Sequence, residues 1–131
     1  MGRVGRLSYS GAPAAVAAGG AVPFNAQVLP CGMSYSGGAL SLRQPGTYRL
    51  SASITTSAAA AGTEAVQLYE GEVPVAGAYA AQAAAAEGDA SNLCIEWIFD
   101  VRHAQSGTAT LSIRSANATN IVHAMMVVER V

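Results

Sequence analysis

Apolar and polar side chains alternate along several short stretches of this chain, and a period of two residues predicts β-strands. Residues 47–55 carry apolar side chains at every second position: Tyr48, Leu50, Ala52 and Ile54. Residues 39–43 alternate in the same way, and a Gln-Pro-Gly segment between the two runs indicates a turn. We therefore expect 39–43 and 47–55 to be neighbouring strands, each with one face on a core.

Two further segments extend the same pattern. Residues 65–69 lead through a Glu-Gly-Glu segment into 73–75, which predicts a hairpin. Pro74 places the second arm of this hairpin at a sheet edge or at the start of a strand. In 93–101 every odd-numbered position is large and apolar, so we expect this face of the strand, Trp97 included, to lie in the core.

The last predicted strand differs from the others in having no polar face. Residues 121–129 are apolar on both faces, which is typical of a strand covered on both sides. We expect one side to face the core and the other a partner subunit.

The alanine-rich stretch 76–86 fits a helix over 80–87, because alanine is the strongest helix former. Because it lies between strand runs, contains Gly77 and ends at Gly-Asp, we favour a strand and loop.

The complete pattern is of short strands separated by turns rich in glycine, proline, serine and asparagine, without a convincing long helix. It predicts an all-β protein: an antiparallel jelly-roll sandwich of about ten strands. The length of 131 residues suits one domain, so we expect residues 1–131 to form a single jelly roll.

Residues 1–21 are expected to form an N-terminal strand and loop. Arg3 and Arg6 precede an apolar stretch over 12–22, as in a signal peptide, but a proline and two glycines interrupt that stretch. A strand that is not cleaved off is therefore the favoured interpretation. No apolar run approaches the roughly 20 residues that span a bilayer, so we expect no membrane insertion.

Composition points to an assembly. Hydrophobic residues make up 51% of the chain and charged residues 11%, compared with about 25% charged residues in a typical protein. These charges are too few to cover the surface of an ordinary monomer, so we expect some apolar surface to meet another chain. The net charge of −1 disfavours nucleic acid and anionic membranes as partners.

Candidate catalytic chemistry is sparse, and we expect no enzyme. The segment 32–36 approaches a nucleophile elbow but lacks its final glycine. Glu96 and Asp100 lie four positions apart on one strand, about 13 Å, which is wider than the carboxylate pairs of glycosidases. His103 falls at a turn. His123 is interpreted as an interface histidine; in a trimer it could alternatively converge on the axis and hold a metal or an anion.

Other polar residues leave alternatives open. The loop containing Glu87 and Asp89 is rich in oxygen ligands suited to calcium, although a solvated loop is favoured. Cys31 and Cys94 lack zinc-site spacing; they form one disulfide or, as we favour, stay as two buried thiols. Residues 117–119 fit a glycosylation sequon or a turn. The aromatic residues that would suit a carbohydrate platform if exposed are Trp97, Tyr9, Tyr35, Tyr48, Tyr69 and Tyr79.

Four motifs, which follow in order over nearly the whole chain, carry a family resemblance. They are Val22-Pro23-Phe24-Asn25, the turn and strand from Pro45 to Ile54, the segment Val73-Pro74-Val75-Ala76-Gly77, and the closing Met126-Val127-Val128-Glu129-Arg130-Val131. Together they resemble the bacterial branch of the complement-head and tumour necrosis factor superfamily, as in the C-terminal heads of collagen-like glycoproteins of the spore exosporium.

This resemblance implies a ten-strand jelly roll that assembles as a homotrimer, trimerises and displays a stalk, and lies on a spore or cell surface. Eukaryotic members often use calcium or a receptor surface, but neither can be carried over to this chain residue by residue, and we expect no cofactor. The alternative is a module of the same fold that binds a glycan or a receptor, as an adhesin does. The residues expected at the trimer interface are His123, Met126, Val128, Ala124 and Ile98.

Overall fold

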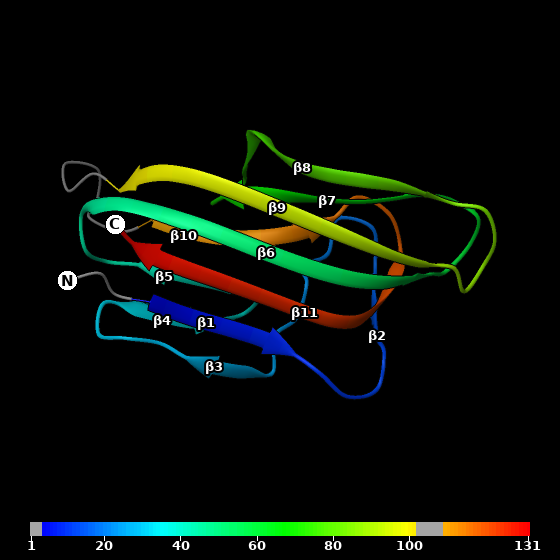
Figure 1. Ribbon diagram of the computed structural model, residues 1–131, viewed down its shortest axis with the longest axis horizontal. Helices are drawn as coiled ribbons and strands as arrows, with labels where there is room; N and C mark the ends of the chain where they lie inside the picture. The colour runs from blue at the N-terminus through cyan, green and yellow to red at the C-terminus, as the bar shows by residue number, and fades with distance from the viewer. Residues whose placement is uncertain (1–3, 102–108) are drawn as a thin grey trace.

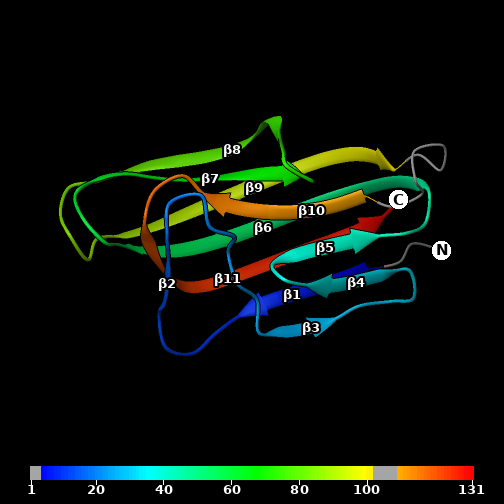
Figure 2. The same cartoon turned by 180° about the vertical axis from the view of Figure 1, so that it is seen from behind.

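The computed structural model describes residues 4–101 and 109–131. These residues form eleven β-strands and no helix, arranged as two antiparallel sheets packed face to face (Figures 1 and 2). The predicted all-β jelly-roll sandwich is confirmed, with eleven strands where about ten were expected. No helix that could span a membrane occurs in the described part of the chain.

The sheet nearest the viewer in Figure 1, here called the front sheet, has the strand order β3-β1-β11-β6-β9, with β2 also paired to β11. The sheet behind it, the back sheet, has the order β4-β5-β10-β7-β8. The front-sheet strands are β1 (Val4–Tyr9), β2 (Ala14–Val16), β3 (Ala26–Val28), β6 (Gly46–Ala58), β9 (Ala90–Val101) and β11 (Thr119–Arg130). The back-sheet strands are β4 (Met33–Ser36), β5 (Ala39–Leu42), β7 (Gly62–Glu70), β8 (Val73–Ala84) and β10 (Ala109–Ser115).

The core lies between the sheets and follows the predicted alternation. Leu50, Ala52 and Ile54 of β6 are buried, whereas Ser51 and Ser53 between them face outward. Along β9 the odd-numbered residues turn inward as expected, and Phe99 stacks on the buried Tyr48 with ring centroids 5.8 Å apart. Trp97 shares this face but is only partly buried, because β9 is the edge strand of the front sheet.

One predicted pairing is wrong. The runs 39–43 and 47–55 lie in different sheets: β5 pairs with β4 and β10, whereas β6 pairs with β9 and β11. The turn between them therefore carries the chain from the back sheet to the front sheet. Alternation shows which face of a strand is buried, but it does not show which strand lies beside it.

The alanine-rich segment forms a strand and loop, as favoured. Residues 73–84 are β8, the edge strand of the back sheet, and the predicted hairpin joins it to β7. Pro74 stands near the start of this edge strand, where a missing N–H is tolerated. The helix propensity of alanine is a weak preference, and pairing with β7 overrides it.

A bulge interrupts β8 opposite Leu68, because Gln67 pairs with Tyr79 whereas Tyr69 pairs with Pro74. The Gln67 side chain holds the bulge by donating a hydrogen bond to the Val75 carbonyl, 2.6 Å away. Gly77 has φ of +89° within this bulge, and a Cβ atom there would lie 3.0 Å from the Trp97 ring. Glycine thus satisfies both the backbone conformation and the close approach of β9.

We expect Gly77→Ala to destabilise the fold more than Gly71→Ala. Both glycines have positive φ, which costs an alanine about 1–2 kcal/mol, but only Gly77 also meets the Trp97 ring. The expected loss is about 1 kcal/mol for Gly71→Ala and about 2–3 kcal/mol for Gly77→Ala, measured by urea denaturation. Equal losses for the two variants would contradict the contact with Trp97.

Candidate functional site

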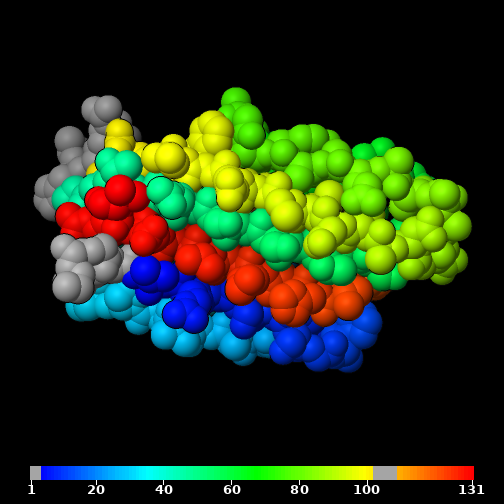
Figure 3. Space-filling model, viewed as in Figure 1, coloured from blue at the N-terminus to red at the C-terminus, as the bar shows by residue number. Residues whose placement is uncertain are grey.

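The outward-facing residues of the front sheet form a broad surface (Figure 3). The strand register aligns them in rows across the sheet. One row consists of Ala26, Ser8, Met125, Ser53 and Cys94, from β3 to β9. The next row consists of Val28, Arg6, Val127, Ser51 and Glu96. Most of these side chains are small or apolar, so another protein surface can approach closely.

Large apolar side chains are exposed on this face. Val28 is 71% exposed and Ile98 63%, and Met125 and Val4 are also exposed. Val28 lies on β3 and Ile98 on β9, at opposite edges of the sheet, so exposed apolar side chains occur on both sides of the face. Exposed apolar side chains gathered on one face favour an interaction site.

Two arginine side chains on or beside the back sheet have partners within the chain. Arg114 forms an ion pair with Glu72 at 2.7 Å and lies over the Tyr69 ring at 4.4 Å. Arg43 donates a hydrogen bond to the Ser34 hydroxyl at 2.9 Å. These two arginines therefore bind groups of their own chain, and we take the front sheet as the candidate contact surface because of its exposed apolar side chains.

Two hollows lie on opposite sides of this front face. One, of about 400 Å³, is lined by Arg49, Glu96, Trp97 and Ile98 on the β9 side. The other, of about 280 Å³, is on the β3 side, and its lining includes Arg6, Val28 and Met125. Each hollow therefore combines apolar side chains with charge.

Arg6 and Glu96 carry opposite charges in one row, Glu96 at its β9 end and Arg6 on β1, next to Val28 at the other end. Strands β11 and β6 lie between β1 and β9, so their Cα atoms are about 14 Å apart at the usual strand spacing. That separation is too wide for an ion pair within one chain. Neither charge forms an ion pair with another described residue, so both can meet a second molecule.

The five residues predicted at an interface are divided between the two faces of the front sheet. His123 and Ile98 are exposed on the outer face, in register with Thr55 and Arg49. Ala124, Met126 and Val128 are buried in the core of one chain, and this part of the prediction is corrected. The outward residues of this part of β11 are Met125 and Val127, which the prediction missed.

A β-bulge in β11 explains why Ala124, Met126 and Val128 point into the core. The register between β11 and β6 shifts between Ile121 and His123, so Val122 has no paired residue. Ile121 faces the core; without the bulge, Met125 and Val127 would also face it. The extra residue reverses the parity and turns Ala124 and Met126 inward instead.

The candidate calcium loop and Asn117 of the glycosylation sequon both lie in turns between strands. Asp89 accepts hydrogen bonds from the backbone N–H groups of Ala85 and Ala86, both at 3.1 Å, and so closes the β8–β9 turn. Glu87 beside it is exposed. Asn117 donates to the Thr63 carbonyl at 2.7 Å, as a turn residue does. Within residues 4–101 and 109–131 no cluster of three metal-ligating side chains occurs.

The other residues that the sequence singled out are the two cysteines, His103 and the carboxylate pair of β9. Cys31 and Cys94 form no disulfide with each other; both are exposed, so the expectation that they are buried is wrong. Cys94 lies 3.9 Å from the Ser53 hydroxyl on the outer front face. His103 lies outside the described residues. Asp100 accepts a hydrogen bond from Thr47 at 2.7 Å, and it lies with Glu96 on the outer side of β9.

A buried carboxylate at the far end of the sandwich was not predicted. Glu64 is only 4% exposed, and the Thr119 hydroxyl donates a hydrogen bond to it. No ion pair to Glu64 forms among the described residues. It borders a cavity of about 300 Å³, whose lining also includes Asn117. Alternation in β7 places position 64 inward, but an acidic residue gives no hydrophobic signal by which to find it.

No protein-family model and no curated protein matches the sequence. Solved structures do match. The globular domain of zebrafish complement 1qA protein has a TM-score of 0.72 at 10% identity and covers 96% of this chain and 94% of its own. This chain has the fold of the complement-head and tumour necrosis factor-like jelly rolls.

Two further structures support this complement-head-like fold. Eiger TNF from S. frugiperda gives a TM-score of 0.66 at 10% identity, with coverage of 100% of this chain and 92% of its own. The PRD1 vertex protein P5 gives 0.58 at 16% identity, with coverage of 97% and 71%. At these identities the likeness concerns the fold alone.

We expect Thr119→Val to destabilise this jelly roll by about 1–3 kcal/mol, because it leaves the buried Glu64 carboxylate without its hydroxyl donor. Thr119→Ser, which keeps the hydroxyl, should lose less than half as much. The double variant Glu64→Leu with Thr119→Val removes both partners and should recover much of the loss. Chemical denaturation measures all three; a Thr119→Val variant as stable as the wild type would contradict the role of the pair.

Proposed function

We propose that this chain is a non-enzymatic module that assembles as a homotrimer through the outer face of the front sheet. It serves as the head of a bacterial surface or spore-surface protein, where it holds a collagen-like stalk in a trimer. The observation that carries the proposal is the composition of that face: exposed Val28, Met125 and Ile98 among small side chains, with opposite charges at its two sides that form no ion pair within residues 4–101 and 109–131.

The positions of Arg6 and Glu96 suit a ring of copies. In a closed ring each copy uses two different patches, so one side of the face meets the opposite side of the next copy. Arg6 of one copy then meets Glu96 of its neighbour. The exposed Ile98 beside Glu96 would fill the hollow at Val28 and Met125. Charge complementarity of this kind fixes the register of an interface more than it adds affinity.

The number of copies comes from the family resemblance. The complement-head-like fold and the four ordered motifs support a trimer, and a trimer also accounts for the low charged fraction of 11%. A location outside the cell, on a spore or cell surface, is proposed on the same ground. His123, exposed near the bulge, is proposed as an interface residue; whether three copies of it converge depends on the position of the axis.

Structural features support a role without catalysis. Ser34, in the elbow-like segment, accepts its hydrogen bond from the Arg43 guanidinium, which is no general base. Glu96 and Asp100 are both exposed on the outer side of β9 rather than opposed across a cleft. Neither arrangement activates a nucleophile or a water molecule.

The mass in solution tests the assembly. Light scattering on dilute protein should give three times the 13.2 kDa of one chain. Met125→Glu places a charge in the proposed interface and should weaken assembly at least about 100-fold, about 3 kcal/mol. Val73→Glu is the matched control, because Val73 is 67% exposed on the back sheet.

The outcomes distinguish the parts of the proposal. A monomeric wild type would contradict assembly altogether. A dimer that Met125→Glu dissociates would keep the front face as the interface but overturn the trimer. A trimer that tolerates Met125→Glu as well as Val73→Glu would overturn the front face.

Charge reversal tests the contact between Arg6 and Glu96. Arg6→Glu and Glu96→Arg each place like charges together, and each should raise the dissociation constant about tenfold or more. The double variant Arg6→Glu with Glu96→Arg restores opposite charges between neighbours and should recover most of the affinity. Sedimentation at low salt measures the three variants, and a double variant weaker than both single ones would contradict the pairing.

A further inference from the structure

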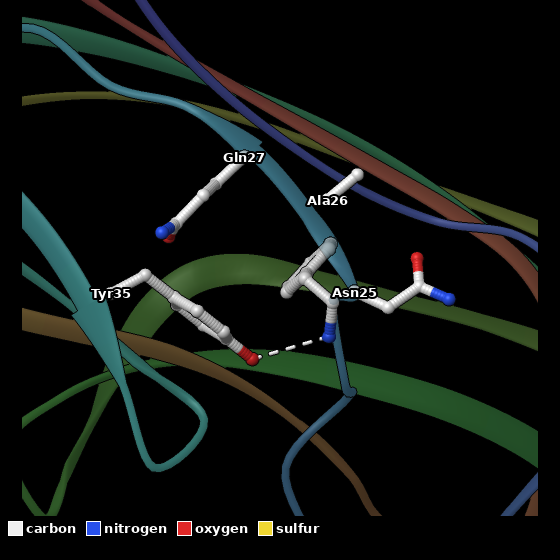
Figure 4. Close-up of a pocket in the computed structure, with 5 residues that line it drawn as sticks. Asn25, Ala26, Gln27 and Tyr35 are labelled. Atoms are coloured by element: carbon white, nitrogen blue, oxygen red, sulfur yellow. Dashed lines mark hydrogen bonds between the residues drawn. The ribbon is translucent and has the colours of Figure 1, made fainter.

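A further hollow lies between β3 and β4. These two strands are at the edge of the sandwich opposite β8 and β9 (Figures 1 and 2). The hollow has a volume of about 230 Å³. Its lining residues are Phe24, Asn25, Ala26, Gln27 and Tyr35 (Figure 4). None of them is charged, so the hollow suits a neutral ligand. It is smaller than the roughly 300–1,000 Å³ of sites for drug-sized molecules, and it has room for a single ring.

The aromatic wall of this hollow is fixed in place. The rings of Phe24 and Tyr35 meet edge to face, with centroids 5.7 Å apart and planes at 83°. The backbone N–H of Phe24 donates a hydrogen bond to the Tyr35 hydroxyl oxygen at 3.2 Å. Because that oxygen accepts here, its own hydrogen stays available to donate to a ligand. Burial raises the pKa of Tyr35, partly offset by the Phe24 hydrogen bond, so the hydroxyl stays protonated at neutral pH.

Gln27 supplies the opposite wall. It pairs with the buried Leu7 in the β1–β3 register, so its side chain takes the inner side of β3, and Figure 4 shows it directed toward Tyr35. Gln27 is exposed, and its amide makes no hydrogen bond to the described residues, so both the oxygen and the nitrogen can bind a ligand. Asn25 instead bonds the Ser10 backbone, at 2.7 and 3.3 Å, and holds the loop that carries Phe24.

We propose that this hollow binds one pyranose ring of a neutral glycan. The planar Gln27 amide donates to one ring hydroxyl and accepts from an adjacent one. The Tyr35 hydroxyl donates to a third oxygen, and the aromatic rings pack against the C–H groups of the sugar. Because the hollow is open and takes a single ring, the rest of the glycan extends into solvent.

The expected affinity is weak for one chain and useful for several. A single ring held by a few hydrogen bonds binds in the millimolar range, about 4 kcal/mol. Copies held on one assembly gain avidity on a surface with repeated sugars. Binding by the isolated hollow does not itself depend on assembly, so the two proposals fail separately.

Amide chemical shifts in a ¹H–¹⁵N titration test the site, with methyl glycosides of glucose, galactose, mannose and N-acetylglucosamine as probes. At least one glycoside should shift the amides of Phe24, Gln27 and Tyr35. Gln27→Ala should weaken that binding about tenfold, since it removes two hydrogen bonds of about 0.5–1.5 kcal/mol each. Gln82→Ala, which removes an amide on the opposite edge, is the matched control and should leave binding unchanged.

Tyr35→Phe provides a second test, because it keeps the ring and removes the hydroxyl; it should weaken binding while a denaturation curve confirms folding. Shifts at the hollow that survive both Gln27→Ala and Tyr35→Phe would overturn the proposal. Absence of shifts with all four glycosides at tens of millimolar would also overturn it. So would a proline-rich peptide that shifts these amides when no glycoside does, because the site would then bind an extended peptide.

Discussion

The long antiparallel pairing of β6 with β11 decides how the rest of the front sheet is arranged. It runs from Tyr48 opposite Arg130 to Ala58 opposite Thr119. On the inner side it places Leu50 beside Val128, both buried in the core. On the outer side it places Ser53 beside Met125. Because side chains alternate along both strands, the packing of the core and the composition of the outer face are consequences of one register.

This register also separates what the sequence predicts from what it does not. Strand positions, the hairpin at Pro74 and the inward face of β9 follow from local patterns, and the structure confirms them. The partners of β5 and β6 depend on contacts distant in sequence, so alternation alone misplaced them. Among the five residues predicted at the interface, Ile98 lies on the outer face, because the side chains of β9 alternate and the odd-numbered ones point into the core. The relation between Arg6 and Glu96 emerges only when β11 and β6 are placed between them.

The edges of the two sheets bear on whether two chains would associate through a face or through an edge. An exposed edge strand without charge invites pairing with another chain. The β8 edge has no charged residue from 73 to 84, but Pro74 removes a backbone donor and the bulge around Gly77 breaks the ladder. At the opposite edge of the sandwich, β3 has only three residues. The β3 edge is short and the β8 ladder is interrupted, whereas β9, the long edge strand of the front sheet, carries the charged residues Glu96 and Asp100, which disfavour pairing with another chain.

The three residues of β3 relate the two proposed surfaces. Ala26 and Val28 pair with Ser8 and Arg6 and so belong to the outer face, whereas Gln27 between them pairs with Leu7 and turns toward Tyr35. Alternation thus gives one short strand a part in both proposed surfaces, the contact with a neighbouring chain and the contact with a ligand. A side chain at position 27 can change without altering the face that 26 and 28 present. Assembly and ligand binding are therefore separable by single substitutions, although the residues that carry them are adjacent in the sequence.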